Sequence, residues 1–199
     1  MANSLDTKFI DLELIFEDDR IYYEYECEGQ IVYTGQVMMR WEDKLMKAHA
    51  DIACHNGGDV LEIGFGMGIS ADHIQANNPS SHTIIELHPK IIEKAKEWAK
   101  DKPSVTIIEG DWFEEMPKLA KYDGIFFDNY GTSFMRFGEI VHNHTKQGAK
   151  VTFWNNSLTP KRIYHRFPIE KVKLTPIEVS PDPNGYFTGN TYFLPEVQY

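Results

Sequence analysis

The chain of 199 residues has the composition of a soluble globular protein, with 42% hydrophobic and 25% charged residues. This length fits one compact domain, because two domains would each need a core built from about a hundred residues or fewer. A net charge of −10 argues against nucleic acid as a partner and favours a cationic ligand. No window approaches the roughly 20 apolar residues of a membrane span, and the N-terminus lacks a signal-peptide pattern. We therefore expect a cytoplasmic protein that contacts no membrane.

The first part of the chain is predicted to form a β-hairpin followed by a helix. Residues 21–34 (IYYEYECEGQIVYT) read as two strands that turn at Glu28 and Gly29. Apolar residues recur at helical spacing over residues 37–55, which predicts an amphipathic helix. We divide the chain into an N-terminal lid or hairpin segment, residues 1–36, and a main part, residues 37–199. Tyr22, Tyr23 and Tyr25 of the hairpin suit a lid over a site and, equally, packing within the hairpin.

From residue 58 onward, short β-branched runs alternate with amphipathic segments, which is typical of a parallel sheet with crossover helices. The predicted strands are residues 60–65, 82–87, 105–110, 122–130 and 150–155. The predicted helices are residues 69–77, 89–101, 114–120 and 132–147. Two further runs, residues 172–180 and 189–197, are joined by the turn-rich PDPNGYFT, which predicts an antiparallel hairpin. The expected class is α/β, with a mostly parallel sheet of about seven strands closed by this hairpin.

Closely spaced glycines follow the first strand of this sheet, in the stretch VLEIGFGMGIS. Gly64, Gly66 and Gly68 would let a ligand approach bare backbone beside a helix N-terminus. The G-x-G-x-G spacing differs from the G-x-G-x-x-G pattern that cradles a pyrophosphate. Glu86 ends the next strand, where an acid can accept hydrogen bonds from both ribose hydroxyls. A nucleoside therefore fits better than a nucleotide, although the glycines could also serve only to shape a tight turn.

The glycine stretch, Glu86, and the pair Asp111 and Trp112 after the third strand together resemble class I S-adenosylmethionine (SAM) methyltransferases. Three stretches narrow the resemblance: VMMRWEDKLM (37–46), VLEIGFGMGIS with HTIIELHP (82–89), and YDGIFFDNYG (122–131). They resemble guanidinoacetate N-methyltransferase and its relatives, including the type that methylates the internal (δ) nitrogen of arginine in fungal proteins. The resemblance implies a Rossmann-like class I methyltransferase fold over residues 37–199. It also implies SAM as the cofactor, with S-adenosylhomocysteine as its product.

The resemblance also implies which residues form the site. Glu42 and Asp128 would be the catalytic residues that grip a guanidino group. The cofactor site would be lined by Met46, Glu62, Gly64, Phe65, Gly66, Met67, Gly68, Ile69, Ser70, Glu86, Leu87, His88, Asp111, Trp112, Phe113 and Asp128. The substrate site would be lined by Met38, Glu42, Asp128, Asn156 and Ser157. No metal is expected, because the histidines of VHNH have no Cys or acid at ligand spacing.

Two carboxylates suit the chemistry of a guanidinium ion. Its pKa of about 13 means that deprotonation at pH 7 would cost about six units, or roughly 8 kcal/mol. Two acids can instead neutralise and orient the planar cation through charge-assisted hydrogen bonds, with one nitrogen in line with the methyl group. That nitrogen becomes far more acidic as it gains the methyl, so Asp128 can accept its proton during or after transfer. Glu42 would chiefly anchor the cation.

These observations leave three functions open. The first is methylation of a small guanidino compound, such as guanidinoacetate, arginine or agmatine, by a monomer or homodimer. It is placed first because 199 residues leave little surface for a protein partner. The second is methylation of the internal nitrogen of arginine in proteins, which the sequences of the motifs IIELHP and FGMGI favour. The third is a SAM-binding interaction module without catalysis, against which the two acids argue.

Overall fold

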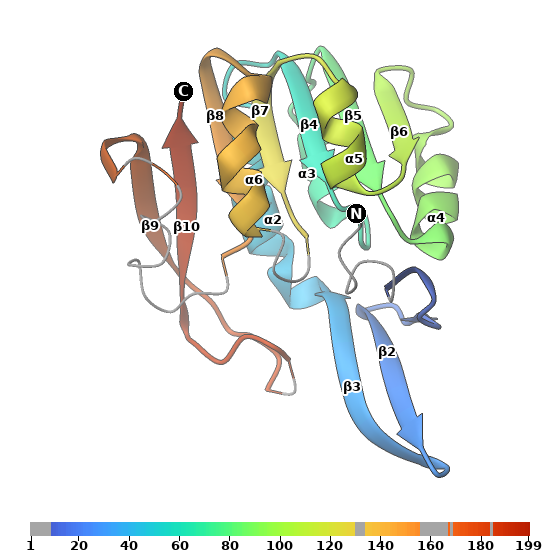
Figure 1. The fold of residues 1–199 in the computed structure, drawn as a ribbon. Coiled ribbons are helices and arrows are strands. Elements are labelled where there is room, and N and C mark those ends of the chain that lie inside the picture. Colours follow the sequence, from blue (N-terminus) through green and yellow to red (C-terminus); the bar gives the residue numbers. More distant parts are fainter. Residues whose placement is uncertain (1–8, 130–133, 156–166, 168, 184) are drawn as a thin grey trace.

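The computed structural model describes residues 9–129, 134–155, 167, 169–183 and 185–199. The strands of its main sheet are β4 (Asp59–Ile63), β5 (Ser81–Glu86), β6 (Val105–Glu109), β7 (Tyr122–Phe127), β8 (Thr145–Phe153), β9 (Val172–Glu178) and β10 (Thr191–Gln198). They lie in the order β6-β5-β4-β7-β8-β10-β9 (Figure 1). The first five strands in this order pair in parallel, whereas β10 is antiparallel to both β8 and β9. The predicted α/β class, with a mostly parallel sheet of seven strands and a closing hairpin, is confirmed.

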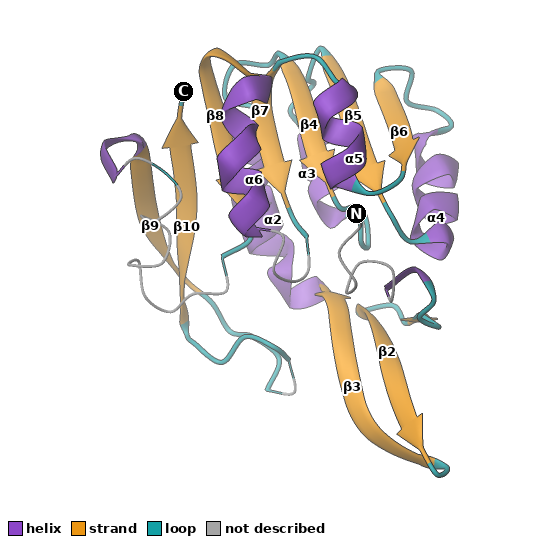
Figure 2. Ribbon diagram, viewed as in Figure 1, coloured by secondary structure: helices purple, strands orange, loops and turns teal. Residues whose placement is uncertain are grey.

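Helices cover both faces of this sheet (Figure 2). The α-helices are α2 (Asp43–Ala53), α3 (Ile69–Ala76), α4 (Pro89–Ala99), α5 (Trp112–Glu115) and α6 (Phe134–Ile140). The short 3-10 helices are η1 (Arg40–Glu42), η2 (Met116–Lys118), η3 (Val141–His144) and η5 (Ile169–Lys171). Helices α2, α3 and α4 pack on one face, and α5 and α6 pack on the other. None of the helices in the described ranges is long and apolar enough to cross a membrane.

The central strands are buried on both faces, which explains their nearly continuous apolar sequence. In β4, Val60 packs toward α2 and α3, while Leu61 and Ile63 pack toward α5 and α6. In β7, Phe126 and Phe127 divide between the two faces in the same way. All five side chains are at most 2% exposed. With both faces covered, a ligand can reach this sheet only at the ends of its strands.

The strand order reverses direction between β4 and β7. From β4 the chain moves outward through β5 to β6, and then returns to the other side of β4 to form β7 and β8. The loops that leave the carboxyl ends of β4 and β7 therefore diverge, and ligands of open α/β sheets bind at such a switch point. The predicted glycine loop follows β4, and Asp128 follows β7, so the topology brings both to this edge.

A second sheet projects from the body as an antiparallel arm (Figure 1). It consists of β1 (Ile15–Phe16), β2 (Arg20–Cys27) and β3 (Gln30–Met39). Glu28 and Gly29 turn between β2 and β3 with φ values of 53° and 75°, as the hairpin prediction required. At its root, β3 leads directly into η1, which carries Glu42. The arm is therefore joined to the predicted site by the chain itself.

The predicted helix over residues 37–55 is wrong at its N-terminal end. Met38 and Met39 belong to β3, where they pair with Ile21 and Arg20, and the α-helix begins only at Asp43. The apolar residues at 37–39 fit helical spacing, but a short apolar run fits a strand as well. Pairing with β2 decides between the two.

The predicted helix over residues 132–147 is also too long. Described helical structure covers residues 134–144, and β8 begins at Thr145 rather than at residue 150. Gly148 has a φ of 84°, a left-handed conformation that an α-helix does not contain. The predicted helix over residues 114–120 likewise differs, because α5 begins at Trp112. The Asp111 carboxylate caps it by accepting a 2.9 Å hydrogen bond from the Phe113 N–H.

Candidate active site

The glycine loop between β4 and α3 packs against the end of β7. Gly64, Gly66 and Gly68 have φ values of 92°, 52° and 78°, a region that favours glycine. A Cβ atom at Gly64 would lie 2.1 Å from the backbone oxygen of Asp128, and one at Gly66 would lie 2.6 Å from the Sδ atom of Met38. The glycines are therefore needed for the loop to reach Asp128 and Met38. This close approach joins the predicted cofactor loop to a predicted catalytic acid.

Glu86, at the end of β5, organises the start of this loop. Its Oε2 atom accepts a 2.9 Å hydrogen bond from the Phe65 N–H, and its Oε1 atom accepts bonds from the N–H groups of Leu87 and His88 at 2.7 and 2.9 Å. A carboxylate oxygen can accept two hydrogen bonds. Oε2 therefore keeps acceptor capacity that a ribose hydroxyl could use, so this residue fits the cofactor predicted for it.

A second buried acid, Glu62, accepts a hydrogen bond from Ser70, just after the glycine loop. Ser70 donates a hydrogen bond to its Oε1 atom, and His82 Nε2 lies 2.9 Å from its Oε2 atom. Glu62 is fully buried, as is Met46 on α2, and Ser70 is 1% exposed. These three predicted cofactor residues are thus buried. That they touch a cofactor directly stays a prediction.

Three other predicted cofactor residues follow β6. Asp111 caps α5, and Trp112 packs edge-on against Phe127 with ring centres 5.0 Å apart. Only 4% of Trp112 is exposed, so most of its ring belongs to the core. Its Nε1–H is buried without a hydrogen-bond partner in the described structure. An orphan donor of this kind calls for an explanation such as a ligand or water, which is compatible with the predicted cofactor site. Phe113 is partly buried beside Trp112.

His88 connects the cofactor edge to the N-terminal segment. Its Nε2 atom lies 3.0 Å from the backbone oxygen of Leu12, and its ring packs against Phe9 at 5.3 Å. Met38, a predicted substrate residue, accepts a 3.2 Å hydrogen bond from the Met67 N–H through its sulfur. Segments that precede the glycine loop in the chain therefore contact both His88 and the loop itself.

The predicted catalytic residue Glu42 is buried, with 2% of its surface exposed. Its Oε1 atom accepts a 2.9 Å hydrogen bond from the Met39 N–H and a hydrogen bond from the Tyr186 hydroxyl. Burial raises the pKa of this carboxyl to about 7, and the two hydrogen bonds oppose the rise. No described residue hydrogen-bonds to its Oε2 atom. Within the described residues, Glu42 therefore has one oxygen held by two hydrogen bonds and one oxygen that no residue contacts by a hydrogen bond.

The predicted base, Asp128, has a hydrogen-bonded backbone, but its carboxylate has no hydrogen-bond partner among the described residues. Its N–H donates a 2.8 Å hydrogen bond to Ile63, and its carboxylate has no hydrogen bond to any described residue. Burial raises its pKa well above the ordinary range, and the charges of Glu42, Glu62 and Glu86 raise it further. The structure thus brings the two predicted catalytic acids into one electrostatic cluster. Such a cluster favours a cationic ligand.

A group of aromatic rings lies next to Glu42, and one of them, Tyr186, donates a hydrogen bond to its carboxylate. The Trp41 ring lies 6.3 Å from Trp154, 6.5 Å from Tyr186 and 6.0 Å from Phe187, and Trp154 packs against Tyr192 at 5.1 Å. Tyr186 and Phe187 lie in the connection between β9 and β10, which the sequence indicated only as a turn. No spacing pattern pointed to them. Their position depends on the pairing of β10 with β8.

A buried chain of hydrogen bonds lies behind these rings and has a single direction. The Thr152 hydroxyl donates to the Pro195 carbonyl at 2.6 Å, so Thr152 Oγ1 must accept from His49 Nδ1–H, also at 2.6 Å. His49 Nε2 is then an acceptor, and the Tyr192 hydroxyl donates to it at 2.9 Å. The Tyr192 oxygen in turn accepts a 2.9 Å bond from the Asn155 N–H. Burial lowers the pKa of His49 to about 3, which keeps its ring neutral as this chain requires.

This chain of hydrogen bonds ends next to the predicted substrate loop. Asn155 is held both by Tyr192 and by a 2.8 Å hydrogen bond from its amide nitrogen to the Phe193 oxygen. The predicted substrate residues Asn156 and Ser157 follow directly, but they lie outside the described residues. Their part in a substrate site stays a prediction.

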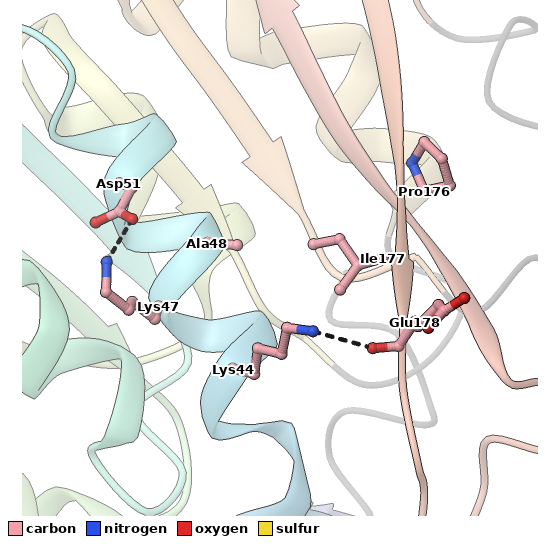
Figure 3. Close-up of a pocket in the computed structure, with 7 residues that line it drawn as sticks. All are labelled: Lys44, Lys47, Ala48, Asp51, Pro176, Ile177 and Glu178. Carbon is pink, nitrogen blue, oxygen red and sulfur yellow. Dashed lines mark hydrogen bonds and ion pairs between the residues drawn. The ribbon is translucent and has the colours of Figure 1, made fainter.

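A separate hollow of about 450 Å³ lies between α2 and β9 (Figure 3). It is lined by Lys44, Lys47, Ala48, Asp51, Pro176, Ile177 and Glu178. Lys47 pairs with Asp51 at 2.6 Å, and Lys44 donates to the Glu178 backbone oxygen at 3.3 Å (Figure 3). None of the predicted site residues lines it. It is therefore distinct from the acid cluster.

Comparison with known sequences identifies the family. The model of the family "Guanidinoacetate N-methyltransferase" matches residues 7–160. Two relatives named protein arginine N-methyltransferase 2, from Aspergillus oryzae and Saccharomyces cerevisiae, are each 32% identical, over 79% and 74% of this chain. The relative of that name from Yarrowia lipolytica is 37% identical over 55% of this chain. The matched regions make up only 38%, 37% and 26% of the lengths of these three relatives.

Comparison with solved structures agrees with the fold. Spermidine synthase from Thermotoga maritima superposes with a TM-score of 0.65 at 15% identity, over 94% of this chain and 72% of that one. Precorrin-6y C5,15-methyltransferase from Geobacter metallireducens has a TM-score of 0.62 at 14% identity, over 81% of this chain and 89% of that one. At such identities the likeness concerns the fold alone. By the family match and this likeness, the chain belongs to the guanidinoacetate N-methyltransferase family and has the class I methyltransferase fold.

Proposed function

We propose that the protein is a SAM-dependent N-methyltransferase that acts on a guanidino group. The observation that carries this proposal is the pair Glu42 and Asp128, because Asp128 lies against the glycine loop and the charge of Glu42 raises its pKa. Each carboxylate also has at least one oxygen without a hydrogen bond to any described residue. Burial makes both charges unfavourable in the free protein, and the charge of Glu42 adds to the cost at Asp128. A planar guanidinium ion would supply the missing positive charge and the matching hydrogen-bond donors. The binding of such a cation should therefore release protons from these acids at neutral pH.

The residues of the chain divide the work of methyl transfer between them. SAM, when bound, would supply an electrophilic methyl group, with Glu86 holding its ribose and the loop from Gly64 to Gly68 lying along it. Glu42 would anchor the guanidinium, and Asp128 would align one of its nitrogens with the methyl carbon. The methyl group would pass from the sulfur of SAM to that nitrogen, which would form a nitrogen–carbon bond at the expense of the carbon–sulfur bond, and Asp128 would accept the proton that the nitrogen loses.

For the substrate, we propose an arginine side chain in a polypeptide, with a free guanidino compound as the second candidate. The names of the curated relatives, protein arginine N-methyltransferase 2, support the first. The description of the matching family, guanidinoacetate N-methyltransferase, supports the second. The sequence alone favoured the reverse order, on the argument that a chain of this length offers little surface to a protein partner.

One set of incubations tests both the reaction and the substrate class. The purified protein with SAM is mixed with arginine-containing peptides and, separately, with guanidinoacetate, arginine and agmatine, and products are identified by mass spectrometry. We expect a mass gain of one methyl on the peptides, placed on the internal nitrogen by fragmentation. Methylation of the free compounds alone would reverse the order of the two candidates. If the protein binds SAM by calorimetry but methylates nothing in either set, a SAM-binding module without catalysis replaces this proposal.

A further inference from the structure

Tyr186 reaches one of the two predicted catalytic acids from a distant part of the chain. It lies in the connection between β9 and β10, 144 residues after Glu42, and its hydroxyl donates a hydrogen bond to Glu42 Oε1. Tyr186 is 38% exposed, whereas Glu42, which it contacts, is 2% exposed. Tyr186 therefore lies at the boundary between the acid cluster and solvent. Nothing in the turn-rich sequence around it indicated this contact.

Neighbouring rings fix the position of the Tyr186 hydroxyl. Its ring lies 5.9 Å from Trp154 in an edge-to-face arrangement and 6.5 Å from Trp41. Trp41 belongs to η1, the same turn that carries Glu42. The Tyr186 ring therefore packs against the same short segment that carries the acid to which its hydroxyl donates. Packing of this kind costs little conformational entropy, because a tyrosine has only two rotatable side-chain bonds. The hydroxyl is thus preorganised rather than merely near the acid.

The distribution of hydrogen bonds on Glu42 is asymmetric. Both donors, the Met39 N–H and the Tyr186 hydroxyl, bind Oε1, and no described residue binds Oε2. With two donors, Oε1 has no lone pair left for a ligand. We propose that Tyr186 is a positioning residue that clamps Glu42 Oε1, so that Glu42 presents Oε2 alone to the guanidinium. This inference rests on the proposed function, since it assigns the guanidinium to that acid.

The clamp has an electrostatic consequence that a purely structural contact would not have. The Tyr186 hydrogen bond lowers the pKa of Glu42, against the larger effect of burial that raises it to about 7. Replacing the hydroxyl by hydrogen removes this donor and leaves the ring in place. The pKa of Glu42 should then rise further, and less of the anionic form that binds a cation should be present at neutral pH.

The test compares Tyr186→Phe with a matched control, Tyr33→Phe, on the exposed face of the arm. The profile of kcat/KM against pH is measured with the best guanidino substrate. A lost hydrogen bond to a charged group corresponds to a shift of about one pH unit. We expect the acidic limb of Tyr186→Phe to move upward by about that amount. Activity should fall about fivefold at pH 7 and recover near pH 9, while the control should match the wild type.

A second measurement is independent of catalysis. Glutamate carboxyl carbons are labelled with ¹³C, and the Glu42 resonance, assigned by its absence in Glu42→Gln, is titrated by NMR without ligands. An upward shift of its midpoint in Tyr186→Phe supports the clamp. An unchanged midpoint together with an unchanged pH profile would overturn it, even if the variant is less stable. If no guanidino compound is methylated, the proposed function fails, while the titration still decides whether Tyr186 controls Glu42.

Discussion

Replacing Glu42 by glutamine should stabilise the protein at neutral and alkaline pH. Burial raises the pKa of this carboxyl from 4.5 to about 7 in the folded protein. At 1.36 kcal/mol per unit, that rise corresponds to about 3 kcal/mol of unfolding free energy. Since the folded state binds more protons than the unfolded state between these two values, stability falls as pH rises from about 4.5 to 7. Above about pH 7 the folded protein is less stable by this full amount, because Glu42 is then charged and buried.

Urea unfolding of the wild type and Glu42→Gln, from pH 4.5 to 8.5 without ligands, measures this cost. Glutamine keeps the oxygen that accepts from Met39 and Tyr186, so the comparison isolates the charge. We expect the stability difference between the two proteins to grow by about 3 kcal/mol in favour of the variant across this range. Glu93→Gln, at an exposed position on α4, is the matched control. A difference that stays constant within about 0.5 kcal/mol would refute the argument, because ΔΔG values of that size are typical of inert surface changes.

Three further substitutions probe other parts of the site. Asp128→Asn should leave SAM affinity in calorimetry unchanged while turnover falls by roughly 10²-fold or more; near-normal turnover would exclude Asp128 as the proton acceptor. Gly64→Ala should lower both thermal stability and SAM affinity, because its Cβ would lie 2.1 Å from the Asp128 oxygen. Gly57→Ala, with a similar positive φ but open space, should cost only roughly 1–2 kcal/mol, and equal losses would contradict the packing argument. Tyr192→Phe should cost about 1–3 kcal/mol in urea unfolding, since it leaves the Asn155 N–H without its partner, and an unchanged midpoint would count against the buried chain of hydrogen bonds.

The parts of the fold that the sequence predicted well are those with local signals. Strands β4 to β7 are short apolar runs bounded by turn residues, and the hairpin turn at Glu28 and Gly29 has its own chemistry. The errors fall where distant pairing decides the outcome. Residues 37–39 form a strand because β2 is their neighbour, and Thr145 begins β8 because it pairs with Tyr122 of β7. Such partners are invisible to a pattern read along the chain.

The candidate site divides in the same way. Glu42, Asp128 and the glycine loop were predicted because their motifs resemble a known family, and the structure places the two acids in one cluster. Tyr186 was missed, because its contact with Glu42 exists only once β10 has paired with β8. The network of His49, Thr152 and Tyr192 was missed for the same reason, since its members come from α2, β8 and β10. Polar partners that meet across elements carry no periodicity in sequence.

The close approach of Gly64 to Asp128 couples the predicted cofactor loop to the predicted catalytic acid through the main chain. The Asp128 N–H donates to Ile63 at 2.8 Å, and the Gly64 N–H donates to Ile85 at 2.9 Å, so neighbouring strands hold the two loops in mutual registration. A displacement of the predicted cofactor loop would therefore move Asp128 with it. The position of the predicted acid relative to the cofactor would then survive small movements of this edge of the sheet. Main-chain hydrogen bonds fix the relative position of the loop and the acid. Long side chains would fix it less well, because they rotate about several bonds.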